Sequence, residues 1–336
     1  MNSAMDSLPI DMSHPAVRDY LALVRLQVLT PLSLLINIAA VLVCAVVMNP
    51  SIGTISKIFP TSLTPSFPVI SVYVAAMYLG QIGFCVLLVL ARKPETKNTL
   101  TKGVGTWIVF ANWVMAFWAV AWVFKWFLTS VILQGILLIL LLFCNISLLT
   151  YHAPTTKRPL DMALIHAPLR FFFVLQFGLM FPLALFVYLG LTYTPVYDGT
   201  PIDYEKYAWP GFGVVFGTNL VSLLVIVLRR DIVWCVAATW ICISIWTLRP
   251  KPQAVYITVL IFTIIHPLGL IAGYIHAHFY SRSEVENGNV ENGNVALPGD
   301  EHPGLRTIHP SNEPRSTPRD GEGRAREFDA EAVWGS

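Results

Sequence analysis

Long apolar stretches alternate with short polar segments between Leu26 and Ala277. A helix of about 20 apolar residues crosses the hydrocarbon core of a bilayer, and backbone surrounded by lipid must satisfy its own hydrogen bonds, which favours helices. The pattern therefore predicts an all-α fold, a polytopic transmembrane helix bundle. Its eight predicted transmembrane helices are Leu26–Met48, Phe67–Leu90, Val104–Phe124, Thr129–Thr150, Leu169–Leu191, Gly211–Leu228, Ile232–Leu248 and Val255–Ala277.

The two ends of the chain differ from this apolar region. Residues 1–25 carry a weak helical periodicity and predict a cytosolic N-terminal segment with an interfacial amphipathic helix. Residues 26–280 form the predicted eight-helix transmembrane domain. Residues 281–336 hold the direct repeat ENGNVENGNV and scattered prolines among many acidic residues, so they predict a disordered acidic cytosolic tail that cannot bury a core of its own.

Composition and charge agree with a membrane protein. Of the 336 residues, 55% are hydrophobic and 12% are charged, whereas about a quarter are charged in an ordinary soluble domain. The net charge of +2 is too small to indicate a nucleic-acid partner. Twelve Lys and Arg residues near the predicted spans fall on the side of the N-terminus and five on the other side, which places both termini in the cytosol.

The polarity of the predicted span interiors limits the chemistry. No Asp or Glu lies well inside a span, which argues against ion coupling through buried carboxylates. Polar groups at mid-membrane normally face the bundle interior, so those present form a candidate neutral pocket for an amphipathic ligand. They are Asn37, Gln81, Asn112, Asn219 and His266. The alternative is a set of interhelical hydrogen bonds of about 0.6 kcal/mol each.

Three further side chains join the candidate ligand-binding residues. Gln176 lies shortly before Pro182, which cannot donate a hydrogen bond to the carbonyl of Gly178 and so predicts a kink beside a possible cavity. Trp118 and Trp122 fall on one helix face, where indoles stack on a flat ligand or pack against neighbouring helices and lipid.

The histidines near the predicted cytosolic face suggest an alternative, a membrane-embedded lipid-modifying enzyme. Its site would use His152, His166 and His276. Their spacing lacks the clustered boxes that direct several imidazoles at one metal, so no metal site and no cofactor are predicted. A third alternative is a membrane scaffold or receptor that acts through the tail.

Small residues predict where helices approach closely. The GxxxG patterns Gly213–Gly217 and Gly269–Gly273 are typical of helix packing in membranes. We expect both to lie at helix contacts.

The order of spans resembles an uncharacterised family of fungal multi-pass membrane proteins known only as a domain of unknown function. Local sequence also resembles the tryptophan-rich sensory and translocator-type proteins. The similar segments are Leu63-Thr64-Pro65, Asn112-Trp113 with Trp118, and Ala167-Pro168-Leu169-Arg170-Phe171-Phe172. This second resemblance implies a five-helix form that binds porphyrins and sterols in a tryptophan-rich cavity, although this chain has more predicted spans and lacks the tryptophan expected after Tyr73.

The sequence thus predicts an integral membrane protein in contact with membrane lipids. Its predicted function is to bind or move a neutral or amphipathic small molecule, of the lipid, sterol or tetrapyrrole class, without carboxylate-based ion coupling. The compartment, the oligomeric state and the ligand stay open.

Overall fold

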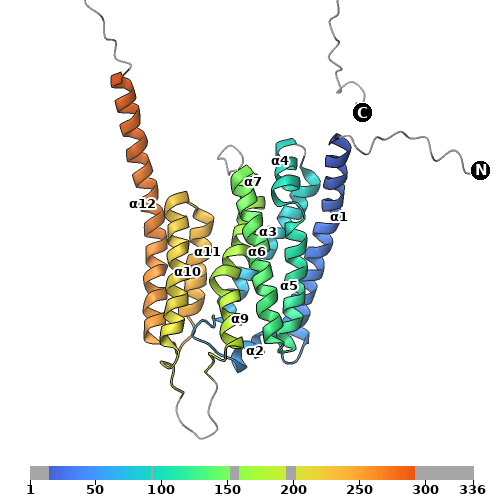
Figure 1. The fold of residues 1–336 in the computed structure, drawn as a ribbon, viewed down its shortest axis with the longest axis vertical. Helices are drawn as coiled ribbons and strands as arrows, with labels where there is room; N and C mark the ends of the chain where they lie inside the picture. The colour runs from blue at the N-terminus through green and yellow to red at the C-terminus, as the bar shows by residue number, and fades with distance from the viewer. Residues whose placement is uncertain (1–14, 92–93, 152–158, 194–201, 292–336) are drawn as a thin grey trace, which may run out of the picture. The chain divides into compact units, whose positions relative to one another are not determined.

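The computed structural model describes residues 15–91, 94–151, 159–193 and 202–291, and regular structure in these ranges is entirely helical (Figure 1). The predicted all-α fold class is confirmed. In chain order the α-helices are α1 Pro15–Leu42, α2 Ile52–Ile58, α3 Phe67–Leu90, α4 Pro94–Asn98, α5 Trp107–Val123, α6 Phe127–Tyr151, α7 Pro159–Asp161, α8 Ala167–Leu175, α9 Phe181–Tyr188, α10 Ala208–Arg229, α11 Ile232–Trp246 and α12 Gln253–Glu291. Short π-helical segments lie at Val43–Val47, Thr99–Val104, Met162–His166 and Gln176–Met180.

The number of membrane spans differs from the prediction. Within the described ranges, six helical segments are long and apolar enough to cross a membrane, and Thr96–Val104 with Trp107–Val123 makes a seventh if this pair, bent by 51°, is one span. The predicted count of eight is corrected because α11 has only 15 residues. At 1.5 Å per residue it covers about 22 Å, whereas the hydrocarbon core is about 30 Å thick.

Local sequence signals set both ends of α11. Arg230 adopts a left-handed conformation with φ of 52° and ends α10. Asp231 then caps α11, since its Oδ1 accepts a hydrogen bond from the backbone N–H of Trp234 at 3.1 Å. Pro250 and Pro252 follow the end of the helix, where proline prevents its continuation. The helix therefore begins at the predicted Ile232 and ends at Trp246, whereas hydrophobicity alone extends it to Leu248.

Five helical segments form a closed ring. Helix α1 packs against α3 and α5, α5 packs against α6, α6 packs against α8 and α9, and α8 packs back against α3. Lys125 lies in the turn between α5 and α6 with φ of 60° and an exposed side chain, between the predicted spans Val104–Phe124 and Thr129–Thr150. All five segments come from the first part of the chain, before Leu191 (Figure 1).

The remaining long helices, α10, α11 and α12, form a second group beside the ring. A Cβ added to Gly211 near the start of α10 would meet Val255 near the start of α12, and one added to Gly273 would meet Val227 near the end of α10. Helices α10 and α12 therefore run parallel. Helix α11 connects the end of α10 to the start of α12 and so runs in the opposite direction.

The two GxxxG patterns, both in this helix group, differ in whether they contact a neighbouring helix. Gly269 and Gly273 face Leu223 and Val227 of α10, so the predicted close contact at the second GxxxG pattern is confirmed. A Cβ added to Gly213 or Gly217 would meet no atom within 4 Å. The prediction for the first pattern is wrong, because no described residue packs against the face of α10 on which these glycines lie.

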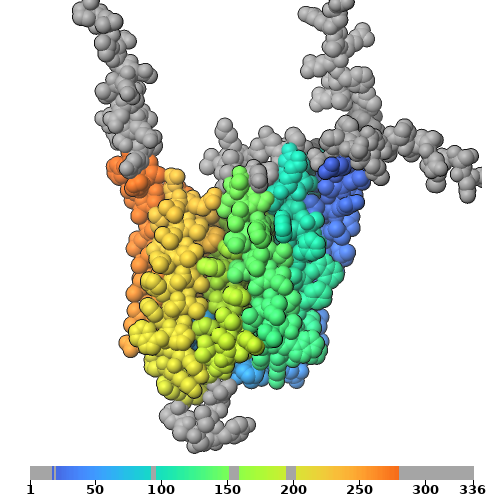
Figure 2. Space-filling model, in the orientation of Figure 1, coloured from blue at the N-terminus to red at the C-terminus, as the bar shows by residue number. Residues whose placement is uncertain are grey.

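Polar and aromatic contacts attach the second group to the ring. Arg170 of α8 pairs with Asp231 before α11 at 2.6 Å. The indole Nε1 of Trp240 donates a hydrogen bond to the carbonyl of Val69 at 3.1 Å, and the ring of Tyr73 lies edge-on to Trp240 with centroids 6.0 Å apart. The space-filling view shows α6, α9 and α10 side by side on one face (Figure 2).

The terminal regions are only partly described. Residues 15–25 form the first turns of α1 and continue without a break into the first span. Helix α12 continues to Glu291, into the predicted tail, and residues 292–336 lie outside the described ranges.

Candidate functional site

A hydrogen-bonded group of three side chains joins α1, α3 and α5 inside the ring. Asn37 Nδ2 donates to Asn112 Oδ1 at 2.8 Å, and the hydroxyl of Tyr78 donates to Asn37 Oδ1 at 3.2 Å. Asn37 is 0% exposed and Asn112 is 1% exposed. The structure thus brings together two of the predicted amides. It adds Tyr78, which was not among the polar residues selected near the middle of the predicted spans.

A break in regular α-helix places Gln176 opposite α5. The π-helical segment Gln176–Met180 separates α8 from α9, and Pro182 occupies the first turn of α9. The proline leaves the preceding turn without its usual donor, so the wider turn lies where the sequence predicts an interruption. Gln176 Nε2 reaches Met115 Sδ at 3.9 Å, a contact between two segments that are not neighbours in the ring.

The tryptophans of α5 divide into buried and exposed rings. Trp118 and Trp122 are 3% and 2% exposed, with ring centroids 5.9 Å apart. Trp107 and Trp113 are 39% and 37% exposed. The two tryptophans selected from the sequence, Trp118 and Trp122, both lie in the interior.

Several buried polar atoms of the ring helices have no hydrogen-bond partner among the described residues. All are neutral, and they come from α3, α5, α6 and the segment between α8 and α9. They are Gln81 Nε2 and Oε1, Asn112 Nδ2, Trp118 Nε1, Trp122 Nε1, Gln134 Nε2 and Oε1, and Gln176 Oε1. A buried polar atom left unsatisfied costs about 1–3 kcal/mol. Such a concentration is unusual, since most buried polar atoms in proteins are paired.

Gln134 is a member of this set that the sequence did not indicate. It lies near the start of its predicted span, so a selection by mid-membrane depth passes over it. Its signal is periodic, because Ser130, Gln134, Leu137 and Leu141 recur at helical spacing and are all 0% exposed.

The other two predicted midplane residues form a separate group on α10, α11 and α12. His266 Nε2 lies 3.3 Å from the carbonyl oxygen of Asn219, and Cys242 Sγ donates to Asn219 Oδ1 at 3.0 Å. His266 is 0% exposed, and the centroids of its ring and of the Phe262 ring are 5.5 Å apart. Asn219 and His266 therefore join one helix group, whereas Asn37, Gln81 and Asn112 belong to the ring.

The three histidines of the alternative enzyme site lie on different parts of the chain. His166 is buried in the π-helical segment before α8, and His276 is on an exposed face of α12. His152 lies outside the described ranges. Among the described residues, no group of three His, Cys, Asp or Glu side chains is arranged to hold a metal ion.

Comparison with known families agrees with this architecture. A model of the TSPO-like protein family matches residues 27–272. The chain belongs to the TSPO-like protein family. No curated protein and no solved structure matches it significantly. Membership in this family supports the conclusion that the chain is an integral multi-pass membrane protein. The family is associated with binding of small hydrophobic molecules such as tetrapyrroles or sterols.

The resemblance to tryptophan-rich sensory proteins is confirmed by this match. In the TSPO-like protein, the three segments that carry the resemblance belong to the ring or lead into it. Leu63-Thr64-Pro65 precedes α3, Asn112, Trp113 and Trp118 lie in α5, and Ala167–Phe172 begins α8. The five ring helices match the number that the resemblance implies, and α10, α11 and α12 account for the additional predicted spans.

Proposed function

We propose that this TSPO-like protein binds a small, largely apolar molecule of the tetrapyrrole or sterol class inside the five-helix ring. The observation that supports this most directly is the set of unpaired amide and indole atoms on the buried faces of the ring helices. A ligand with a few polar groups provides the partners that these atoms lack. Its apolar body packs against Met115, Trp118 and Trp122.

The chemistry of the ring favours a neutral mode of recognition. Amides supply donors and acceptors, and indole N–H groups supply donors alone. Ligand pockets commonly combine an apolar lining with a few polar groups that fix orientation. The absence of Asp and Glu well inside the spans argues against ion-coupled movement of the ligand, so binding is the function that we propose.

Titration of the purified full-length protein with protoporphyrin IX and with cholesterol tests this proposal. We expect saturable binding of at least one of the two, measured in lipid nanodiscs from tryptophan quenching for the porphyrin and by radioligand retention for cholesterol. Gln134→Leu and Trp118→Phe should each weaken binding about tenfold, because loss of one hydrogen bond of about 1.4 kcal/mol has that effect.

A matched control comes from the same helix. Trp113 is exposed and stacks on Phe117, so Trp113→Phe should leave affinity within about twofold of the native protein. Equal losses in Trp113→Phe and Trp118→Phe would show that the interior indole has no specific role. Absence of saturable binding of both probes would contradict the proposal.

For orientation, we propose that both termini face the cytosol. The support is the excess of Lys and Arg on the N-terminal side of the predicted spans. Terminal epitope tags on the full chain should react with antibody in intact-organelle preparations if the proposal holds, and Lys125 replaced by Cys should then react only with reagents from the opposite side.

A further inference from the structure

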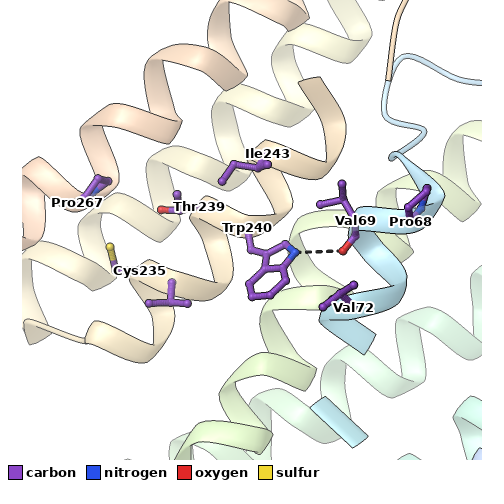
Figure 3. A pocket seen from close by; sticks show the side chains of 9 residues that line it. Pro68, Val69, Val72, Cys235, Thr239, Trp240, Ile243 and Pro267 are labelled. Atoms are coloured by element: carbon purple, nitrogen blue, oxygen red, sulfur yellow. Dashed lines mark hydrogen bonds between the residues drawn. The ribbon is translucent and has the colours of Figure 1, made fainter. Parts of the chain in front are cut away.

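A groove on the outer side of the ring lies between α3, α11 and α12, away from the candidate site. It encloses ≈ 690 Å³ and is lined by Pro68, Val69, Val72, Cys235, Val236, Thr239, Trp240, Ile243 and Pro267. In Figure 3, α11 forms the floor, α3 carries Val69 and Val72 on one side, and Pro267 of α12 lies on the other. The lining residues of α11 recur at helical spacing, and from Cys235 to Ile243 they extend over about 12 Å.

The lining offers almost no polarity. Pro68 and Pro267 have no backbone N–H, and the indole N–H of Trp240 is already donated to the carbonyl of Val69 at 3.1 Å (Figure 3). The remaining polar groups of the lining side chains are the Thr239 hydroxyl, midway along the α11 lining, and the Cys235 thiol at its start. At that end of the lining a ligand finds only a thiol, which is a weak hydrogen-bond donor and acceptor.

The position of the groove determines what surrounds it. Phe67–Leu90 and Gln253–Phe279 are candidate membrane spans, so both walls belong to segments that face hydrocarbon. Val72 is 56% exposed and Val236 is 44% exposed, so the groove opens outward into that medium. The short α11 leaves room over its outer face between two longer helices.

We propose that this groove is a binding site for an acyl chain of a membrane phospholipid. A flexible chain fits a narrow apolar groove without a polar anchor, and its headgroup remains at the membrane surface. A sterol fits less well, because its hydroxyl would need a partner at the end of the groove, where the lining offers only the weakly hydrogen-bonding Cys235 thiol, and Thr239 is in the middle. The bound chain would pack across the seam where α11 joins α3. This inference is independent of ligand binding inside the ring.

Photo-crosslinking tests the site. The full-length protein is reconstituted in nanodiscs of phosphatidylcholine that contain a trace of phosphatidylcholine with a diazirine in one acyl chain, and labelled residues are mapped by mass spectrometry. We expect labelling of Cys235, Val236 and Thr239 several times stronger than labelling of exposed residues on the outer faces of α1 and α6. Val72→Phe, which fills the groove, should reduce this labelling at least threefold.

Val86→Phe is the matched control, since Val86 is on the same helix, is 51% exposed and does not line the groove. It should leave groove labelling unchanged. Val236→Phe provides a second filling variant from α11, and gel filtration establishes that each variant is folded. Uniform labelling of all exposed faces would overturn the proposal, as would preferential labelling by a diazirine sterol, crosslinking to a second copy of the chain, or insensitivity to both filling variants.

Discussion

The guanidinium Nη1 of Arg170 lies 2.6 Å from the carboxylate Oδ2 of Asp231, and both side chains are 4% exposed. Asp231 also caps α11 through Trp234, so one carboxylate fixes the start of that helix and holds it against α8. The pair is therefore a buried charged link between the ring and the second helix group.

Removal of one partner of this ion pair should lower the stability of the fold. Arg170→Met leaves the Asp231 carboxylate buried without its counter-ion, and we expect a loss of about 3–5 kcal/mol in the free energy of unfolding. Arg229→Met changes an exposed neighbour and should stay within about 0.5 kcal/mol of the native value. Unfolding in mixed micelles measures both. Similar small changes in the two variants would show that the ion pair does not stabilise the fold.

The Asn37–Asn112 hydrogen bond should contribute less than a buried ion pair. Hydrogen bonds between membrane helices average about 0.6 kcal/mol, so Tyr78→Phe should lower stability by about that amount. Asn37→Leu removes both bonds of the group and should cost about 1 kcal/mol. The same unfolding assay compares them. A larger effect of Tyr78→Phe than of Asn37→Leu would contradict a group centred on Asn37.

Two glycines of α10 should respond in opposite directions to alanine. A Cβ at Gly211 would lie 2.5 Å from Ser62 Oγ and 2.8 Å from Val255 Cγ2, so Gly211→Ala forces atoms apart and should cost about 1–3 kcal/mol. Gly213→Ala meets no atom within 4 Å and should raise stability by about 0.5 kcal/mol, because glycine is entropically unfavourable in a helix. Thermal denaturation in detergent ranks the two variants, and equal midpoints would contradict the close contact at Gly211.

Lys251, in the connection before α12, should make stability depend on pH. Its Nζ donates to the carbonyl of Thr64 at 2.6 Å, and burial lowers the pKa of this amine to about 7. The unfolded chain keeps the ordinary lysine pKa of about 10.4 and so binds more protons between these values. The free energy of unfolding should therefore rise as pH increases from about 7 towards 10, and this contribution should be lost below that window.

Lys251→Met removes the titrating amine and should flatten the rise, as measured by unfolding at a series of pH values. Lys57→Met changes an exposed lysine of α2 and should preserve it. If native protein and Lys251→Met show the same slope, the amine is not the origin of the pH dependence.

Hydrophobicity predicted most helix boundaries, because a helix that crosses the hydrocarbon core needs a continuous apolar run of about 20 residues. The predicted Phe67–Leu90 is identical to α3, and Lys125 lies in the turn between two predicted spans. Helix α11 begins at the predicted Ile232 but ends at Trp246, two residues before the predicted Leu248, ahead of prolines that an apolar average does not weigh. The π-helical segment at Gln176 was predicted only as an interruption, since the sequence does not say how a helix accommodates Pro182.

The candidate site was predictable in its residue types but not in its grouping. A position near the middle of a predicted span was the criterion that selected Asn37 and Asn112, which contact each other. The same criterion selected His266, which lies in another helix group. Depth along a span carries no information about which helices are neighbours. Gln134 shows the converse, because its place on a buried stripe mattered more than its depth.

The closed ring uses only helices encoded before Leu191, and this order has a consequence for biogenesis. During translation, all five segments emerge from the ribosome before any residue of α10, and domains generally fold as units from the N-terminal side during synthesis. The ring can therefore close in the membrane first. Helices α10, α11 and α12 then meet an assembled surface that already presents Arg170 to the incoming Asp231.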